Sequence, residues 1–308
     1  MIMKKYNFIL VTAILCGTLL TSCKKDDDGG GSNVTPPRDR GEEAIAAEAE
    51  IIAYLETHFY NYEEFNAPSE DFDYRIKFDT IAGDNANKTP LFDQVESKTV
   101  QDRVDEDVTY TLYYLNVRQG GGDSPNFPDL VVNSYEGKKI RDNKVFDGSV
   151  SPVKFDLTQI INGLQDVMIE FNGADPDLTV QNPDGTLTFK DFGIGAAFIP
   201  SGLGYFSNPP TASGIQLYDQ LIFTFQLYDV ETGDQDGDGI ISILEDLNNN
   251  GIEEDDDTDG DGAPNYIDGD DDGDGVPTSV EVEFDAEGNI IFMDSDNDGI
   301  PNYLDSDS

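Results

Sequence analysis

Alternating apolar and polar residues predict β-strands in the middle of the chain. Residues 108–117 (VTYTLYYLNV) alternate and are rich in tyrosine and β-branched residues, and residues 130–135 (LVVNSY) and 221–230 (LIFTFQLYDV) follow the same pattern. Between them, residues 157–168 (LTQIINGLQDVM) carry apolar side chains at helical spacing. Several strands with one short helix predict an α+β domain, an antiparallel sheet wrapped on that helix.

A longer helix is predicted before this region. Residues 42–60 (EEAIAAEAEIIAYLETHFY) have helical spacing and acids in the first turn. The apolar stripe comprises Ile45, Ala49, Ile52 and Leu55. His58, the single histidine, lies near the end of this helix, where a surface or capping role is more common than a catalytic one. Residues 61–105 are polar, with one short strand-like piece at 74–78, and no chemistry is assigned to them.

The first residues are typical of an export signal. Lys4 and Lys5 precede an apolar run of about a dozen residues, which is signal-peptide length and too short to span a bilayer. The run ends in LTSC, which resembles a bacterial lipobox and implies cleavage before Cys23, acylation of that residue and a stable membrane anchor. An ordinary secretory signal with a chance cysteine is the alternative. The following KKDDD resembles the sorting signal of surface lipoproteins in Bacteroidota, so we expect an outer-membrane lipoprotein facing the periplasm or the cell surface.

Charge excludes one class of partner. The 308 residues include 18 Lys and Arg against 63 Asp and Glu, a formal net charge of −45, and no basic residue follows Lys190. Nucleic-acid binding is excluded because a polyanion would be repelled and no basic face is present to release counterions. The second half of the chain is therefore expected to be a solvated acidic tail or a cation-binding segment.

A succession of short motifs in the middle region resembles a known family. In order, these motifs are Tyr135-Glu136-Gly137, Val145-Phe146-Asp147, Phe155-Asp156-Leu157, Ile160-Ile161-Asn162-Gly163-Leu164, IPSGLGY at 199–205, Ile215 and Leu221-Ile222-Phe223. This series resembles the FKBP-type peptidyl-prolyl cis-trans isomerases over residues 108–230. The resemblance implies a twisted antiparallel sheet with an apolar pocket between sheet and helix, proline-containing proteins as clients, and no cofactor for isomerisation.

The resemblance also implies which residues line that pocket. They are Tyr135, Phe146, Asp147, Ile160, Ile161, Leu164, Tyr205, Ile215 and Phe223. By analogy, proline would pack on Leu164 between the two phenylalanines, the Tyr205 hydroxyl and aromatic ring edges would face the substrate carbonyl, and the Ile161 N–H would hold the peptide. Asp147 and Tyr135 would form a polar wall. The alternative is that these side chains are simply core, as most buried Phe and Ile are.

Three departures from the family pattern put turnover in question. Leu164 stands where well-known members carry tryptophan. The stretch GSVSPVK, residues 148–154, is interpreted as a short loop without the arginine that often pairs with the pocket acid. Residues 170–189 are longer than the usual link, and their PDG turn predicts an added hairpin.

The acidic tail contains five copies of a calcium-loop pattern. DQDGDGIISILE, starting at Asp234, fits D-x-D-x-D-G-x₅-E at every position. Carboxylates, a backbone carbonyl at position 7 and a glycine at position 6 suit a hard divalent cation. The expected ligands are Asp234, Asp236, Asp238, Ile240 (through its carbonyl) and Glu245; Asp246, Asn248, Asn250 and Asp257; Asp257, Asp259, Asp261 and Asp268; Asp270, Asp272, Asp274 and Glu281; and Asp294, Asp296, Asp298 and Asp305.

These loops lack the flanking helices of EF-hands. Pro264 and Pro301 occupy the eighth loop position, where a helix would begin. The arrangement resembles thrombospondin type 3 repeats, which implies structural calcium ions in place of a hydrophobic core. A disordered acidic tail that binds nothing tightly is the alternative. Residues 285–292 are expected to form a small hairpin between the last two loops.

The predicted organisation follows from these segments: a signal peptide (1–22), a flexible tether (23–41), an N-terminal helix and extension (42–105), an FKBP-like domain (106–231) and calcium-binding repeats (232–308). The favoured hypothesis is a membrane-anchored prolyl isomerase that assists folding of envelope or surface proteins. The alternative is a weakly active or inactive peptide-binding or adhesion module on a calcium-stiffened arm.

Overall fold

The computed structural model describes residues 36–308. The expected signal peptide, the acylated Cys23 and the first part of the tether lie outside these residues. Within the described part of the chain, no helix is both long and apolar enough to cross a membrane.

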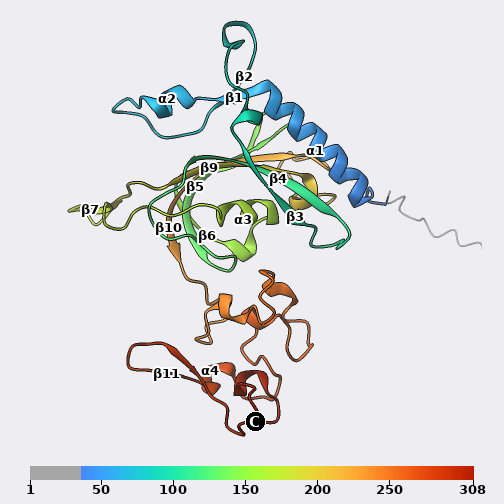
Figure 1. The fold of residues 1–308 in the computed structure, drawn as a ribbon, viewed down its shortest axis with the longest axis vertical. Coiled ribbons are helices and arrows are strands. Elements are labelled where there is room, and N and C mark those ends of the chain that lie inside the picture. The colour runs from blue at the N-terminus through green and yellow to red at the C-terminus, as the bar shows by residue number, and fades with distance from the viewer. Residues whose placement is uncertain (1–35) are drawn as a thin grey trace, which may run out of the picture. The chain divides into compact units, whose positions relative to one another are not determined.

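A six-stranded antiparallel sheet organises the middle of the chain (Figure 1). Its strands, in spatial order, are β3 (Glu96–Gln101), β4 (Thr109–Arg118), β9 (Gly193–Ile199), β10 (Leu221–Glu231), β5 (Leu130–Lys139) and β6 (Val145–Asp156). Every neighbouring pair is antiparallel. The predicted α+β class with an antiparallel sheet is confirmed.

Both faces of this sheet are buried. Along β10, Leu221, Phe223, Phe225 and Leu227 belong to a core with α3 (Asn162–Met168), whereas Ile222 belongs to a second core with α1 (Arg40–Thr57). Successive residues of a strand point to opposite faces, so one strand serves both cores. Figure 1 shows α3 and α1 on opposite sides of the sheet.

Three strands of the six-stranded sheet were not predicted. β9 (GIGAAFI) is buried at all seven positions, so it lacks the alternation of a half-exposed strand. β6 is an edge strand with mostly exposed residues, and it contains the stretch 148–154 that was interpreted as a loop. That interpretation is wrong: the segment stays paired with β5, with its irregularities absorbed by two register shifts. β3 pairs with β4 and forms the other edge.

The predicted apolar stripe of the first helix is wrong, although the helix itself is present. Asp39 caps α1 by accepting a hydrogen bond from the Glu42 N–H at 2.9 Å. Ile45 is 74% exposed, and the buried apolar positions are Ala47, Ile51, Tyr54 and Leu55. Tyr54 belongs to the buried face, so the stripe is rotated relative to one drawn through the aliphatic residues alone. The chain then leaves the helix in β1 (His58–Tyr60), which pairs with β2 (Phe78–Thr80).

The predicted helix at 157–168 is divided into two parts. A 3₁₀ turn at Leu157–Gln159 begins where the Asp156 carboxylate accepts the Thr158 N–H at 2.9 Å. Ile160 and Ile161 are extended, and α3 begins only after them. Two adjacent β-branched residues favour this extended link. The division leaves the two isoleucines beside the sheet and outside the helix.

The remaining elements are small. α2 (Tyr62–Asn66) follows β1, and the hairpin predicted within residues 170–189 is present as β7 (Val180–Gln181) and β8 (Leu187–Thr188). The strand-like piece at 74–78 is a strand only from Phe78, because Tyr74 has a left-handed φ of 56°. In the tail, 3₁₀ turns alternate with loops around α4 (Thr278–Glu281), and the predicted hairpin is formed by β11 (Val282–Phe284) and β12 (Ile290–Phe292).

The α3-side core predicts a large effect of one substitution. Phe171 is fully buried and meets Phe225 edge-on, with ring centroids 4.9 Å apart. We expect Phe171→Ala to lower the free energy of unfolding by about 3–5 kcal/mol in a urea titration, because the vacated volume cannot refill. The matched variant Phe92→Ala removes a 42% exposed ring and should cost about 1 kcal/mol or less. Equal losses in the two variants would contradict this packing.

Candidate functional site

The nine residues expected to line a pocket come from six places in the fold. Tyr135 lies on β5, Phe146 and Asp147 on β6, Leu164 on α3 and Phe223 on β10; Ile160 and Ile161 precede α3, while Tyr205 and Ile215 lie between β9 and β10. The eight members other than Asp147 all belong to, or pack against, the α3-side core. The structure thus brings together residues separated by as many as 88 positions in sequence.

We call these nine residues the aromatic cluster. Aromatic rings form one wall of it. The Phe146 and Phe223 rings meet edge-on with centroids 5.5 Å apart, and Tyr135 stacks on Phe223 at 6.3 Å. Gly137 lies under these rings, and a Cβ atom there would come within 2.7 Å of Phe146. The Tyr-x-Gly motif therefore has a steric cause: only glycine lets the two phenylalanines approach the strand.

A polar edge borders the aromatic cluster. The Tyr135 hydroxyl donates to Asp147 Oδ2 at 2.8 Å, and burial together with this bond raises the pKa of Tyr135 to about 12. Burial and the Asp147 charge also raise the pKa of Tyr205, so its hydroxyl stays protonated. Within residues 36–308, no acceptor takes the Tyr205 hydroxyl proton, so this donor is available to a ligand.

A second available donor lies at the start of α3. Ile161 is the N-cap residue, and its carbonyl accepts from Leu164 and Gln165. Its own N–H has no acceptor among the described residues, as expected ahead of the first helical turn. The site therefore presents a backbone N–H and a phenol O–H near apolar surface.

The aromatic cluster is closed at its base and open on one side. Leu164 and Phe223 are 2% and 5% exposed, whereas Tyr135, Phe146, Ile160, Ile161 and Tyr205 are half-buried and Asp147 is exposed. Leu164 and Phe223 are buried as ordinary core residues are. The five half-buried side chains at the open edge are more exposed than core residues, so they are not explained by packing alone. A cavity of about 280 Å³ lies elsewhere, and Tyr135 is the one member of the nine that also lines it.

The five acidic loops share one backbone geometry. In each loop the residue at position 4 and the glycine at position 6 have positive φ; the glycines are Gly239, Gly251, Gly262, Gly275 and Gly299, with φ of 75–100°. In four loops the N–H of position 2 donates to the side chain at position 9, as in Asp271 to Thr278 at 3.1 Å and Ser295 to Asn302 at 2.8 Å. The spacing read from the sequence therefore corresponds to a repeated fold.

Four groups of acids converge closely enough to hold a cation. Three of them are the position 1, 3 and 5 acids of single loops: Asp257, Asp259 and Asp261; Asp270, Asp272 and Asp274; and Asp294, Asp296 and Asp298. The fourth combines Asp236, Asp238 and Glu245 with Asp271 from another loop, and we call it the buried quartet. Asp234, expected as a ligand there, is not among these four acids; its carboxylate accepts the Gly237 N–H at 2.8 Å, the bond that Asp257 and Asp294 make in their own loops.

The remaining expected ligands lie at the margins of these groups. Asp268 and Glu281 are close enough to the neighbouring loop acids to feel their charge, and Asp305 is close to Asp294. In the second loop, Asp246 accepts backbone N–H groups from Asn250 and Gly251, and Asn248 donates to Asp255 and Asp256. Ile240, expected to contribute its carbonyl, is fully buried in the small tail core with Val282 and Tyr303.

The buried quartet contains unsatisfied oxygens. Both carboxylate oxygens of Glu245 and of Asp271 are buried without a hydrogen-bond partner in the described part of the chain. Burial, then the neighbouring acids, raises the pKa of Glu245 to about 9, of Asp271 to about 8 and of Asp236 to about 7. Buried acceptors normally have donors, so these oxygens fit a divalent cation bound by oxygen ligands.

Sequence reasoning did not identify three buried acids. Asp271 stands at an even loop position, and Glu253 and Asp256 lie outside the expected ligand positions, yet all three have orphaned buried oxygens. The one signal for Asp271 was an extra acid in the run GDDDGDG. Asp256 and Glu253 carried no signal beyond the general acidity of their segment.

Comparison with known proteins gave a family model that matches part of the tail and a set of similar solved structures. A model described as BamM C-terminal matches residues 235–292. No curated protein sequence matches the chain.

The similar solved structures include a peptidyl-prolyl cis-trans isomerase from Pseudomonas syringae, with 15% identity, a TM-score of 0.36, and coverage of 64% of this chain and 98% of that one. FkpA from Escherichia coli has 21% identity, a TM-score of 0.33, and coverage of 62% of both chains. The N-terminal domain of FKBP42 from Arabidopsis thaliana has 11% identity, a TM-score of 0.32, and coverage of 45% and 95%.

The raised pKa values predict how the metal-free tail responds to pH. An acid whose pKa is higher in the folded state binds more protons there, so its contribution to stability is present at low pH and is lost as the pH rises through the folded value. For Glu245, Asp271 and Asp236 this window runs from about pH 4 to about pH 9. We expect chelator-treated protein to lose the near-ultraviolet circular dichroism of buried Tyr266 and Tyr303 as pH increases across it. Tail stability that rises with pH would contradict this assignment.

Proposed function

We propose that the aromatic cluster is the substrate site of an FKBP-type peptidyl-prolyl cis-trans isomerase. The observation that carries this proposal is the assembly, at one open edge, of half-buried aromatic rings and two donors without acceptors, the Tyr205 hydroxyl and the Ile161 N–H. The motif resemblance over residues 108–230 supplies the reaction class. Neither a nucleophile nor a proton relay is required of the site.

The chemistry follows from the substrate bond. Rotation about an X-Pro amide has a barrier of about 18–20 kcal/mol because the bond has partial double-bond character. The rotated amide loses this conjugation and is less polar at its carbonyl than either planar form. An apolar wall therefore binds the rotated form better than the planar forms, which is the requirement for rate acceleration.

Each part of the aromatic cluster has a proposed task. Phe146 and Phe223 enclose the pyrrolidine ring, and Leu164 forms the floor under it. The Ile161 N–H binds a carbonyl of the peptide and so fixes its register, while the protonated Tyr205 hydroxyl donates to the substrate. Asp147 holds Tyr135 in place by accepting a hydrogen bond from its hydroxyl.

An exchange assay tests this proposal. We expect the protein to accelerate cis-trans exchange of a short X-Pro peptide measured by NMR, and we expect Phe146→Ala combined with Tyr205→Phe to reduce the acceleration at least tenfold, about 1.4 kcal/mol in the barrier. Phe92→Ala, on an exposed ring outside the aromatic cluster, is the control and should exchange the peptide at the wild-type rate. A wild-type rate equal to the uncatalysed rate would reject the enzyme.

A peptide-binding module is the second candidate. The observation that favours it is Leu164, an aliphatic floor without the flat aromatic platform of well-known family members. This candidate has the same site and the same donors but little turnover. Peptide-induced shifts at Ile161 and Tyr205 without accelerated exchange would identify it.

The tail is proposed to hold structural calcium. The buried quartet and the three single-loop groups provide oxygen ligands only, which suits calcium better than zinc. Calcium, when bound, would offset the mutual repulsion of these carboxylates. The tail core is small, with Ile240, Val282 and Tyr303 as its buried apolar members, so cation binding would provide much of its folding energy.

One pair of matched variants tests the buried quartet. Glu245→Gln neutralises a fully buried ligand, and we expect one class of calcium site to weaken at least tenfold by isothermal titration calorimetry. Glu254→Gln removes an equal charge from an exposed residue outside every group and should leave calcium affinity nearly unchanged. Equal effects of the two variants would show general electrostatics instead of a site.

Membrane attachment completes the proposal. The sequence before the described residues supplies the acylation motif at Cys23 and the lysine-plus-acid stretch after it. We therefore propose an outer-membrane lipoprotein whose clients are proline-containing envelope or surface proteins.

A further inference from the structure

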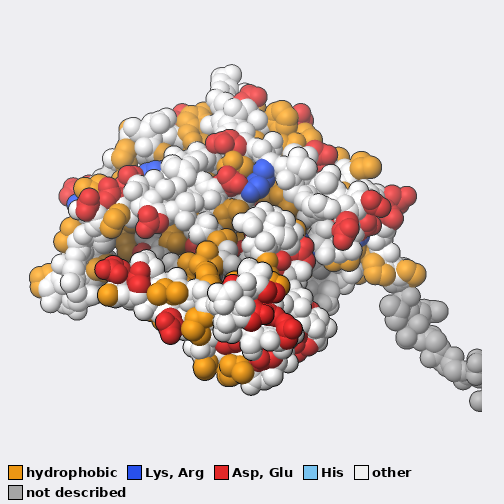
Figure 2. Space-filling view, turned by 60° about the horizontal axis from the view of Figure 1, so that its bottom comes forward, with side chains coloured by type: hydrophobic (Ala, Val, Ile, Leu, Met, Phe, Trp, Pro, Cys, Tyr) orange, Lys and Arg blue, Asp and Glu red, His pale blue; other side chains and the backbone are white. Residues whose placement is uncertain are grey.

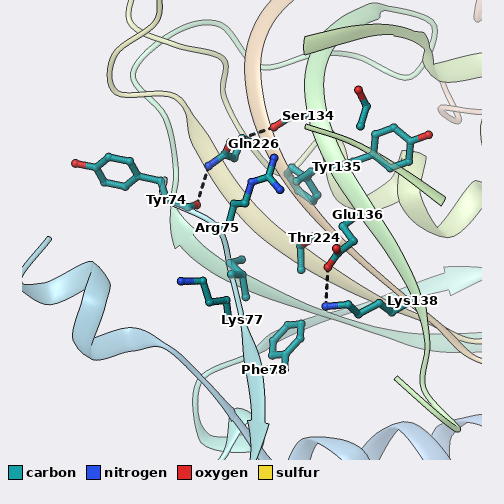
Figure 3. Close-up of a pocket in the computed structure, with 13 residues that line it drawn as sticks. Tyr74, Arg75, Lys77, Phe78, Ser134, Tyr135, Glu136, Lys138, Thr224 and Gln226 are labelled. Carbon is teal, nitrogen blue, oxygen red and sulfur yellow. Dashed lines mark hydrogen bonds and ion pairs between the residues drawn. The ribbon is translucent and has the colours of Figure 1, made fainter. Parts of the chain in front are cut away.

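A cavity of about 280 Å³ lies on the face of the sheet opposite α3 (Figure 3). Residues 74–78 form one wall, and β5 and β10 form the floor through Ser134, Glu136, Lys138, Thr224 and Gln226. In both strands these floor residues alternate with the residues that face α3. The cavity therefore lies on the opposite face of the sheet from the aromatic cluster, and Tyr135 is the one residue of the nine that also lines it.

The wall is held over the sheet by side-chain amides and does not pair with the strands. Gln226 Nε2 donates to the carbonyls of Asp73 and Tyr74 at 2.9 and 2.8 Å. Asn61 accepts the Lys77 N–H at 2.9 Å and donates to the Arg75 carbonyl at 3.1 Å. These bonds pair backbone groups of the wall with side chains instead of with β5 or β10. The segment is therefore held away from the sheet, and the cavity lies beneath it.

The conformation of Tyr74 shows that this wall is strained. Its φ of 56° is left-handed, which is uncommon and strained for a bulky residue. Strain of this kind persists where the surrounding structure enforces it, here through the Gln226 bonds. The chain therefore turns at Tyr74 and presents Arg75 to the cavity.

Positive charge is concentrated here in a strongly acidic protein. Arg75, Lys77 and Lys138 line the cavity against a single acid, Glu136. Lys138 pairs with Glu136 at 2.6 Å and Lys77 with Glu64 at 3.0 Å. Both lysines are therefore neutralised locally, and Arg75 is the cation on which anion binding in this cavity would depend.

Arg75 is the cation in this cavity with unused donors. Its Nε forms an ion pair with Asp73 Oδ2 at 3.8 Å, which is too long for a hydrogen bond, and its guanidinium donates a hydrogen bond to no residue in the described chain. The Thr224 hydroxyl in the floor likewise has no partner there. Figure 3 shows the Arg75 side chain reaching over β5 and β10.

We propose that this cavity binds a small organic monocarboxylate with an apolar body. The Arg75 guanidinium matches a carboxylate with two parallel donors, and Thr224 can donate a third hydrogen bond. Ile76 and Phe78 provide the apolar walls. A dianion such as phosphate fits less well, because Glu136 lies in the wall and the two lysines already have carboxylate partners.

A pair of nearly isosteric probes tests the charge requirement. We expect N-acetyl-phenylalanine to bind the full-length protein and to shift the amide resonances of residues 74–78 and 134–138 in an NMR titration. N-acetyl-phenylalaninamide, which lacks the charge, should bind at least tenfold more weakly. Inorganic phosphate is the third probe, and binding as tight as that of the amino acid derivative would overturn the assignment to an organic carboxylate.

Matched variants test the residues. Arg75→Gln should weaken binding of N-acetyl-phenylalanine roughly 10- to 100-fold, the usual loss when a hydrogen-bonded ion pair is removed, and should not change binding of the amide. Lys138→Gln, which leaves Glu136 uncompensated at the cavity, should also weaken it. Lys154→Gln, an equal charge change on β6 outside the cavity, should not.

The outcomes separate this site from the proposed isomerase. Unchanged affinity in both Arg75→Gln and Lys138→Gln, equal binding of acid and amide, or shifts centred on Phe146 and Tyr205 would each overturn the proposal. Prolyl exchange catalysis should be unaffected by Arg75→Gln. The proposal of a carboxylate site is therefore tested independently of the proposal for the aromatic cluster.

Discussion

The need to bury both faces of one sheet shapes the rest of this molecule. β9 is buried at every position and β10 at nearly every position in its first seven, so each face requires its own cover. On one side the cover is α3, whose seven residues extend only about 10 Å. On the other side it is α1 followed by the irregular segment after β2. Neither cover reaches the whole sheet. The aromatic cluster and the cavity under residues 74–78 lie where the covers end.

The sequence predicted features that repeat with a fixed period or spacing. Apolar and polar residues alternate along β4, β5 and β10 because part of each strand has one face more exposed than the other. Glycine and asparagine recur in the acidic loops because each turn needs residues that tolerate positive φ. It failed where burial is uniform, as in β9, or where a cap competes with helical spacing, as at Asp156. The stripe of α1 was misplaced because Tyr54, and not Ile45, is the residue that faces the sheet.

Long-range proximity was accessible only where motifs came in a recognisable order. That order predicted the residues of the aromatic cluster, although their roles remain proposals. No spacing rule could have joined Asp271 to the first acidic loop, because a repeat specifies its own turn and not which other loop lies against it. The cavity under residues 74–78 could not be predicted from the sequence for a similar reason. Its wall is held by hydrogen bonds from the distant Gln226 and Asn61, and residues 74–78 show no periodic pattern that indicates this position. The acidic side chains of the loops are prominent on the surface shown in Figure 2, whereas both oxygens of Glu245 and of Asp271 in the buried quartet are buried without a partner in the described chain.

The central claim is that the open edge beside α3 receives a prolyl peptide. Titrating ¹⁵N-labelled protein with a short peptide that contains one X-Pro bond tests it most directly, since every amide reports separately. The account predicts that the largest perturbations fall on the Ile161 amide and on residues around Phe146 and Tyr205, with the cis and trans peptide signals exchanging faster as protein is added. Perturbations confined to other surfaces, or none at saturating peptide, would contradict it.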